Sequence, residues 1–144
     1  MPLTIVVADD SAEYRLIVQT LLQPLNTVSV IGEAADGVEA LELVRRLRPD
    51  LLITDLVMPH LNGIDLTRRV REESPQTMII LISSYTEDAY LLMASDSGAD
   101  AFVNKNVLTS SLLLAVHDVV RRRSGGGGGS QPPFISGSSA SAMQ

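Results

Sequence analysis

Short apolar runs alternate regularly with segments of helical periodicity, and this alternation constrains the fold more than any other feature of the sequence. The apolar runs are Leu3–Ala8, Val28–Ala34, Leu51–Thr54, Met78–Ile82 and Ala101–Val103. Between and after them, apolar side chains recur every three or four residues, as they do from Tyr14 to Leu25. This is the spacing of one helix face, so the pattern predicts five strands and five helices in strict alternation.

This alternation predicts a parallel β-sheet with helices on both faces, because parallel neighbours must be joined by a crossover. The predicted strands are almost continuously apolar, as expected of strands that are covered on both faces. Right-handed crossovers limit the possible topologies. We expect the strand order 2-1-3-4-5 of a doubly wound, flavodoxin-like α/β fold with five helices.

Capping residues mark several helix boundaries. Asp36–Glu39 has the spacing of a capping box at the start of the second helix. Asn62 precedes the third helix, and Thr86 precedes the acidic first turn of the fourth. Ser74-Pro75 ends the third helix, because proline disfavours helical backbone in the residue before it.

Charge divides the chain into two regions. All 11 Lys and Arg residues and all 17 Asp and Glu residues, which give a net charge of −6, lie before Ser124. We expect residues 1–123 to form one domain and residues 124–144 to be an uncharged linker or tail rich in Gly, Ser and Pro. Such a composition buries too little apolar surface to offset its ordering entropy. The tail has no helical pattern, so we expect no output domain within it.

Composition also disfavours several classes of protein. The chain has no cysteine, which excludes disulfides, thiolate metal sites and cysteine nucleophiles. The acidic balance argues against direct contact with nucleic acid, because domains that bind it usually carry a basic face. No apolar run has the length of a membrane span, and the N-terminus lacks a basic signal-peptide start. We therefore expect a cytoplasmic protein.

Polar side chains stand at the carboxyl ends of four predicted strands. Asp9 and Asp10 follow the first strand, and Asp55 follows the third. Ser83 follows the fourth strand, and Lys105 lies just beyond the fifth. Because these four strands are neighbours in the expected order, we predict that the five side chains converge on one site.

Three carboxylates at one site repel one another, so either some of them bind protons or a cation lies among them. Oxygen ligands without His or Cys suit Mg²⁺. A metal ion and a lysine can neutralise a transferring phosphoryl group while a hydroxyl donates a hydrogen bond to it. Since an aspartate can be the nucleophile, the residues predict phosphoryl transfer to an aspartate.

The same residues resemble a known family, the receiver domains of bacterial two-component response regulators. The matching motifs are Asp9-Asp10, Asp36–Leu41, Asp55–Pro59 with Gly63, Ser83, and Phe102–Lys105. The resemblance covers residues 3–121, and its details are closest to receivers that precede a helix-turn-helix output domain.

This resemblance implies that Asp55 is the phosphoacceptor. Its phosphodonor would be a sensor histidine kinase, a phosphotransfer protein or a small acyl phosphate. Asp10 would ligate Mg²⁺ directly, Asp9 would support it, and the backbone carbonyl of Val57 would be a further ligand. The domain would assist its own phosphorylation and dephosphorylation without being an enzyme for other substrates.

The resemblance also assigns a switch. Lys105 and Ser83 would contact the phosphoryl oxygens, and Phe102 would turn inward when Ser83 moves toward the phosphate. In this family, the rate at which water attacks the phosphoryl group depends on two residues. One lies two positions after the acceptor and the other two positions after the hydroxyl residue, which are Val57 and Tyr85 in this chain. Valine cannot hydrogen-bond a water and tyrosine can shield the group, so we expect slow dephosphorylation.

One position departs from the family pattern. Receivers often have a proline after the lysine, frequently with a cis bond, whereas this chain has Asn106. A cis bond before a residue other than proline costs about 2.5–4 kcal/mol, so we expect a trans bond here.

Other functions stand as alternatives. A receiver-like interaction module that is never phosphorylated would usually lack an acid, the lysine or the acceptor, and all are present here. A Mg²⁺-dependent aspartate phosphatase of the haloacid-dehalogenase type needs a second acid two residues after the nucleophile, where this chain has Val57. A flavin-binding module would carry a phosphate loop in place of the acidic Asp9-Asp10-Ser11.

Exposed apolar residues predict two interaction surfaces. The core face of the first helix is expected at Tyr14, Ile17, Val18, Leu21 and Leu22. At about 100° per residue, Leu16 points away from that face, and Leu114 points away from the core face of the fifth helix. We expect these two leucines to support a phosphorylation-dependent homodimer. The consecutive apolar residues Tyr90–Met93 cannot all face the sheet, so we expect a partner to dock on the fourth helix.

Overall fold

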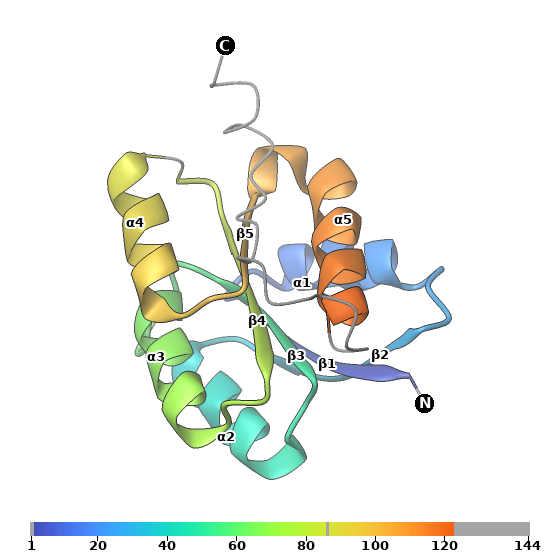
Figure 1. The fold of residues 1–144 in the computed structure, drawn as a ribbon, viewed down its shortest axis with the longest axis horizontal. Coiled ribbons are helices and arrows are strands. Elements are labelled where there is room, and N and C mark those ends of the chain that lie inside the picture. The colour runs from blue at the N-terminus through green and yellow to red at the C-terminus, as the bar shows by residue number, and fades with distance from the viewer. Residues whose placement is uncertain (1, 86, 123–144) are drawn as a thin grey trace.

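The computed structural model describes residues 2–85 and 87–122. Within them, strands and α-helices alternate as predicted, and a short 3-10 helix, η1, precedes the last helix (Figure 1). The strands are β1 (Leu3–Ala8), β2 (Val28–Ala34), β3 (Leu51–Asp55), β4 (Met78–Ser83) and β5 (Ala101–Asn104). The helices are α1 (Ala12–Leu22), α2 (Gly37–Leu47), α3 (Gly63–Glu73), α4 (Asp88–Ser97), η1 (Lys105–Val107) and α5 (Leu108–Arg121).

The five strands form one parallel sheet in the order β2-β1-β3-β4-β5, which confirms the predicted topology. Ala8 of β1 pairs with Thr54 of β3, the residue before Asp55. Ser83 of β4 pairs with Asn104 of β5, the residue before Lys105. The carboxyl ends of these four strands therefore lie along one edge of the sheet, where the sequence predicts the site.

Helices cover both faces of the sheet and divide the core into two apolar layers. Figure 1 shows α1 and α5 on one face and α2, α3 and α4 on the other. Alternate strand residues supply the two layers: Ile53 and Val103 face α1 and α5, whereas Leu52 and Phe102 face the other three helices. This two-sided burial explains why the strands are almost continuously apolar.

The predicted caps are present where the structure describes them. Asp36 accepts a hydrogen bond from the backbone N–H of Glu39 at 2.8 Å, and the Glu39 carboxylate accepts one from the N–H of Ala35 at 2.8 Å. Asn62 caps α3 through the N–H of Asp65 at 2.9 Å, and α3 ends before Ser74. The predicted cap Thr86 and the predicted tail, 124–144, lie outside the described residues.

The predicted core face of α1 includes one residue, Ile17, that the structure leaves exposed. Val18 and Leu22 are buried, and Tyr14 and Leu21 are partly buried against the same layer, but Ile17 is 39% exposed. Ile17 borders a surface hollow that Lys105 also lines. Periodicity places Ile17 on the inner side of the helix, but its side chain faces this hollow, whose other wall is formed by residues of η1 and the start of α5.

Both predicted apolar surfaces are exposed. Leu16 of α1 and Leu114 of α5 are 65% and 62% exposed, on two helices that lie side by side. On α4, Leu92 is 65% exposed, whereas Tyr90 and Leu91 pack against the core. Among the described residues, no helix has both the length and the hydrophobicity needed to cross a membrane.

Candidate functional site

The predicted carboxylates meet at the carboxyl edge of the sheet. Asp9 and Asp10 follow β1, and Asp55 is the last residue of β3. One carboxylate oxygen from each of the three lies within 4.8 Å of the others. Asp9 and Asp55 are buried, whereas Asp10 is exposed to solvent. The cluster is thus closed at its base and open on the side of Asp10.

Lys105 extends into this cluster from the start of η1. Its ammonium lies 3.1 Å from Asp9 Oδ2 and 3.3 Å from Asp55 Oδ2. No peptide bond between described residues is cis, so the bond from Lys105 to Asn106 is trans, as predicted. The Asn104 side chain accepts a hydrogen bond from the N–H of Asn106 at 2.8 Å, which fixes the start of η1.

The electrostatics of the cluster are those of an anionic site, in which three carboxylates lie together and two of them contact the ammonium of Lys105. Burial and repulsion by Asp9 raise the pKa of Asp55 to about 6, although Lys105 acts in the opposite direction. Burial by itself lowers the pKa of Lys105, but the charges of Asp55 and Asp9 and the hydrogen bonds to them outweigh burial and raise it. Lys105 is therefore a fixed positive charge.

The loop after Asp55 is held close to the site. The Leu56 N–H donates to Asp55 Oδ1 at 2.8 Å, and the Gly63 N–H donates to the Leu56 carbonyl at 2.7 Å. A Cβ atom on Gly63 would collide with the backbone carbonyl of Asp55, so only glycine allows α3 to begin this close to the end of β3. Val57, on this loop, is 48% exposed.

The two predicted switch residues lie on β4 and β5. Ser83 is buried at the end of β4, and its hydroxyl accepts a hydrogen bond from the Tyr85 N–H at 2.9 Å. Phe102 is fully buried in the layer beneath α2, α3 and α4. Its side chain is therefore part of the core on this face of the sheet.

Two residues of α1 that sequence reasoning did not assign to the site also contact it. Arg15 donates from Nη1 to the Asp9 carbonyl at 2.6 Å and pairs with Glu33 at 2.7 Å. The Tyr14 ring faces Lys105, with 3.9 Å between Nζ and the ring centroid. Periodicity assigns Tyr14 only to the core face, and no local pattern links either residue to β1 or η1.

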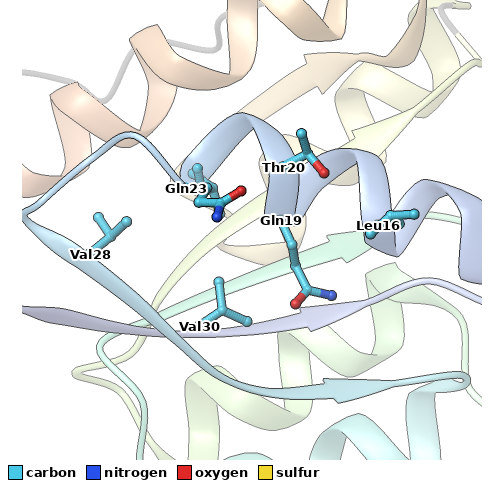
Figure 2. Close-up of a pocket in the computed structure, with 7 residues that line it drawn as sticks. Leu16, Gln19, Thr20, Gln23, Val28 and Val30 are labelled. Carbon is cyan, nitrogen blue, oxygen red and sulfur yellow. The ribbon is translucent and has the colours of Figure 1, made fainter.

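A separate hollow between α1 and β2 lacks this chemistry. It has a volume of about 390 Å³ and is lined by Leu16, Gln19, Thr20, Leu22, Gln23, Val28 and Val30. Figure 2 shows Leu16, Gln19 and Thr20 on α1 and Val28 and Val30 on β2. None of them is ionisable at neutral pH, so the carboxylate cluster is the better candidate for a functional site.

The donor set of the cluster fits a hard divalent cation. Three carboxylates face one ammonium, so two negative charges are left without an internal partner when all three are ionised. The oxygen ligands, the open side at Asp10 and the lack of His and Cys donors match the coordination preferences of Mg²⁺.

Sequence comparison identifies related proteins. Residues 5–117 match the family described as Response regulator receiver domain. Response regulator protein VraR of Staphylococcus saprophyticus subsp. saprophyticus is 30% identical over 116 residues, which are 81% of this chain and 56% of that protein. VraR of Staphylococcus aureus strain COL shows the same identity and coverage. The chain thus spans about half the length of the curated relatives it matches.

Solved structures show the same fold. The REC domain of AraT, a response regulator from Geobacillus stearothermophilus, has a TM-score of 0.79 and is 32% identical, covering 87% of this chain and 98% of that chain. A LuxR-family two-component response regulator from Aurantimonas sp. SI85-9A1 has a TM-score of 0.82 and is 26% identical, covering 99% of this chain and 94% of that chain.

Proposed function

Because this chain belongs to the response regulator receiver domain family, we propose that Asp55 is its phosphoacceptor in two-component signalling. The observation that carries the proposal is the position of Lys105, whose ammonium lies between Asp9 and Asp55 at 3.1 and 3.3 Å. Of the three carboxylates, Asp55 combines burial at a strand end with direct contact to the lysine. Asp9 is also buried and shares that contact, and each of the two carboxylates accepts one backbone N–H, Asp9 from Ser11 and Asp55 from Leu56. Asp55 is chosen over Asp9 because it begins the motif Asp55–Pro59, which matches the acceptor position of the family.

In the proposed reaction, an oxygen of the ionised Asp55 carboxylate attacks the phosphorus atom of the donor. A new P–O bond forms while the donor's P–N or P–O bond breaks, and the leaving imidazole or carboxylate retains the electron pair. The Lys105 ammonium and the Ser83 hydroxyl stabilise charge on the phosphoryl oxygens. Asp9, Asp10, Asp55 and the Val57 carbonyl would hold Mg²⁺, which supplies charge neutralisation when bound.

The phosphodonor we propose is a phosphohistidine on a sensor kinase or phosphotransfer protein, with a small acyl phosphate as a chemical substitute. On this proposal the domain is a signalling acceptor and its output is a changed protein-interaction surface. Residues 1–123 form the receiver, residues 124–144 form a linker or tail, and Ser83 and Phe102 couple the phosphoryl group to that surface. A phosphatase is disfavoured because Val57 cannot serve as the second acid.

Intact mass spectrometry tests the assignment. Treatment with acetyl phosphate and Mg²⁺ should add one phosphoryl group to the wild type, and neither Asp55→Asn nor wild type in EDTA should gain it. Asp118→Asn, which removes a carboxylate from α5 away from the cluster, is the matched control and should be phosphorylated. An adduct that persists in Asp55→Asn would place the acceptor elsewhere, and a wild type without adduct would favour the module that is never phosphorylated.

A further inference from the structure

The aromatic ring of Tyr14 is the least expected component of the site. It lies on the first turn of α1, and its centroid is 3.9 Å from Lys105 Nζ. A cation at this distance from a ring face is attracted by the ring quadrupole. The contact joins two elements that are 91 residues apart in the chain, since Tyr14 follows β1 and Lys105 follows β5.

We propose that Tyr14 is a positioning residue, whose ring holds the Lys105 ammonium in place for phosphoryl transfer to Asp55. This inference rests on the proposed function, because it assigns Tyr14 a part in the same reaction. Lysine has a long, flexible stem and its ammonium can rotate freely about it. The two carboxylates constrain the ammonium on one side, and the tyrosine ring constrains it on another.

The backbone beneath the ring is itself tied to the carboxylates. Asp9 Oδ1 accepts a hydrogen bond from the Ser11 N–H at 2.9 Å, and the Ser11 hydroxyl accepts one from the Tyr14 N–H at 3.2 Å. Lys105 then contacts both the Tyr14 ring and Asp9 Oδ2. The contacts close a ring through Asp9, Ser11, Tyr14 and Lys105, so movement of the tyrosine would be transmitted to both partners of the ion pair.

Burial strengthens the contact. The Lys105 side chain is 9% exposed, and Tyr14 is partly buried against the α1 and α5 layer. Cation–π attraction gains from the loss of competing water. When a phosphoryl group arrives, the ring can retain the lysine while the ammonium exchanges a carboxylate oxygen for a phosphoryl oxygen.

The sequence allows a direct measurement, because Lys105 is the only lysine in the chain. Protein grown with ¹³C-labelled lysine gives one set of lysine side-chain NMR signals. A ring facing the ammonium shifts the adjacent methylene protons upfield, so wild type and Tyr14→Phe should show upfield Hε signals and Tyr14→Leu should not. Tyr90→Leu, which removes a ring from α4, is the matched control and should leave the signals at their wild-type positions.

Rates of phosphorylation by acetyl phosphate provide the second measurement. Tyr14→Leu should react about three- to thirtyfold more slowly, the range expected for loss of a partly to fully desolvated cation–π contact, and Tyr14→Phe should restore the rate. Equal rates in these two variants, or a wild-type Hε signal at the Tyr14→Leu position, would overturn the inference. The NMR measurement needs no phosphodonor, so it tests the Tyr14–Lys105 contact separately from the proposed function, and a missing adduct with upfield Hε signals would overturn the function and not the contact.

Discussion

Arg15 donates a hydrogen bond from Nη1 to the backbone carbonyl of Asp9 at 2.6 Å. That carbonyl belongs to the peptide that joins Asp9 to Asp10, so the arginine fixes the backbone from which both carboxylates project. The ion pair with Glu33 at 2.7 Å holds the guanidinium from the side of β2. Groups behind the ligands of a metal commonly orient those ligands and adjust the affinity for the metal.

Removal of Arg15 should therefore weaken Mg²⁺ binding. We expect Arg15→Met to raise the dissociation constant about tenfold, the lower end of the range for residues that support a ligand. Calorimetric titration with Mg²⁺ measures it. Arg46→Met removes the same charge from an exposed position on α2, and its affinity should stay at the wild-type value. Loss of positive charge by itself should favour binding of a cation, so an equal loss of affinity in the two variants would contradict the role assigned to the Asp9 contact.

The raised pKa of Asp55 predicts how stability depends on pH without metal. The folded protein retains the Asp55 proton up to a pH of about 6, whereas the unfolded chain releases it near the ordinary aspartate pKa of 3.8. This group's stabilising contribution is therefore complete below pH 3.8 and is lost as pH rises through 6. Above pH 6, Asp55→Asn in EDTA should be about 1–3 kcal/mol more stable than wild type.

Urea unfolding of both proteins between pH 4 and pH 7.5 measures this difference. Other titrating groups are common to wild type and variant, so the difference in unfolding free energy isolates Asp55. The two proteins should approach equal stability at the acid end. A difference that is independent of pH would contradict the burial and repulsion assigned to Asp55.

Mg²⁺ should reverse the destabilisation by neutralising the excess negative charge. At a concentration 100 times its dissociation constant, a ligand that binds only the folded state adds about 2.7 kcal/mol of stability. We expect a higher melting temperature with Mg²⁺, its reversal by EDTA, and a smaller shift below pH 6, where protons compete for Asp55. An equal shift in Asp55→Asn would indicate that the ion binds elsewhere.

Spontaneous dephosphorylation should be slow, because neither Val57 nor Tyr85 favours attack by water. Both side chains are about half exposed, at 48% and 44%, and Tyr85 lies against the Tyr90 ring at a centroid distance of 5.1 Å. The double variant Val57→Asn, Tyr85→Glu should lose the phosphoryl group faster, as measured by intact mass after removal of the donor. Unchanged decay in the double variant would contradict this explanation.

The exposed leucines lie on two surfaces, to which we assign different interactions. We propose that Leu16 and Leu114 form the contact of a phosphorylation-dependent homodimer and that Leu92 belongs to a docking surface for another protein. Sedimentation of the acetyl phosphate-treated protein should show a dimer in wild type and in Leu92→Glu, but a monomer in Leu16→Glu. Loss of the dimer only in Leu92→Glu would reverse the assignment, and a wild type that stays monomeric would refute the dimer.

The sequence alone was sufficient to predict the strands, the topology and the carboxylate cluster. Continuous apolar runs identify Leu51–Asp55 and its neighbours as strands within one or two residues, because a strand covered on both faces tolerates few polar side chains. Once the strand order follows from the alternation, residues at the strand ends must meet. The sequence alone therefore predicts that Asp9, Asp55 and Lys105 lie together.

Only the tertiary structure decided what surrounds those residues. Periodicity describes which side of one helix is apolar, but it contains no information on which side chain of another element lies opposite. The contacts of Tyr14 with Lys105 and of Arg15 with Asp9, and the exposure of Ile17, depend on how closely α1 approaches the loops after β1 and β5. The position of α1 is set by its packing against the sheet and α5. This packing brings together residues that are far apart in the chain, so it leaves no local pattern in the sequence.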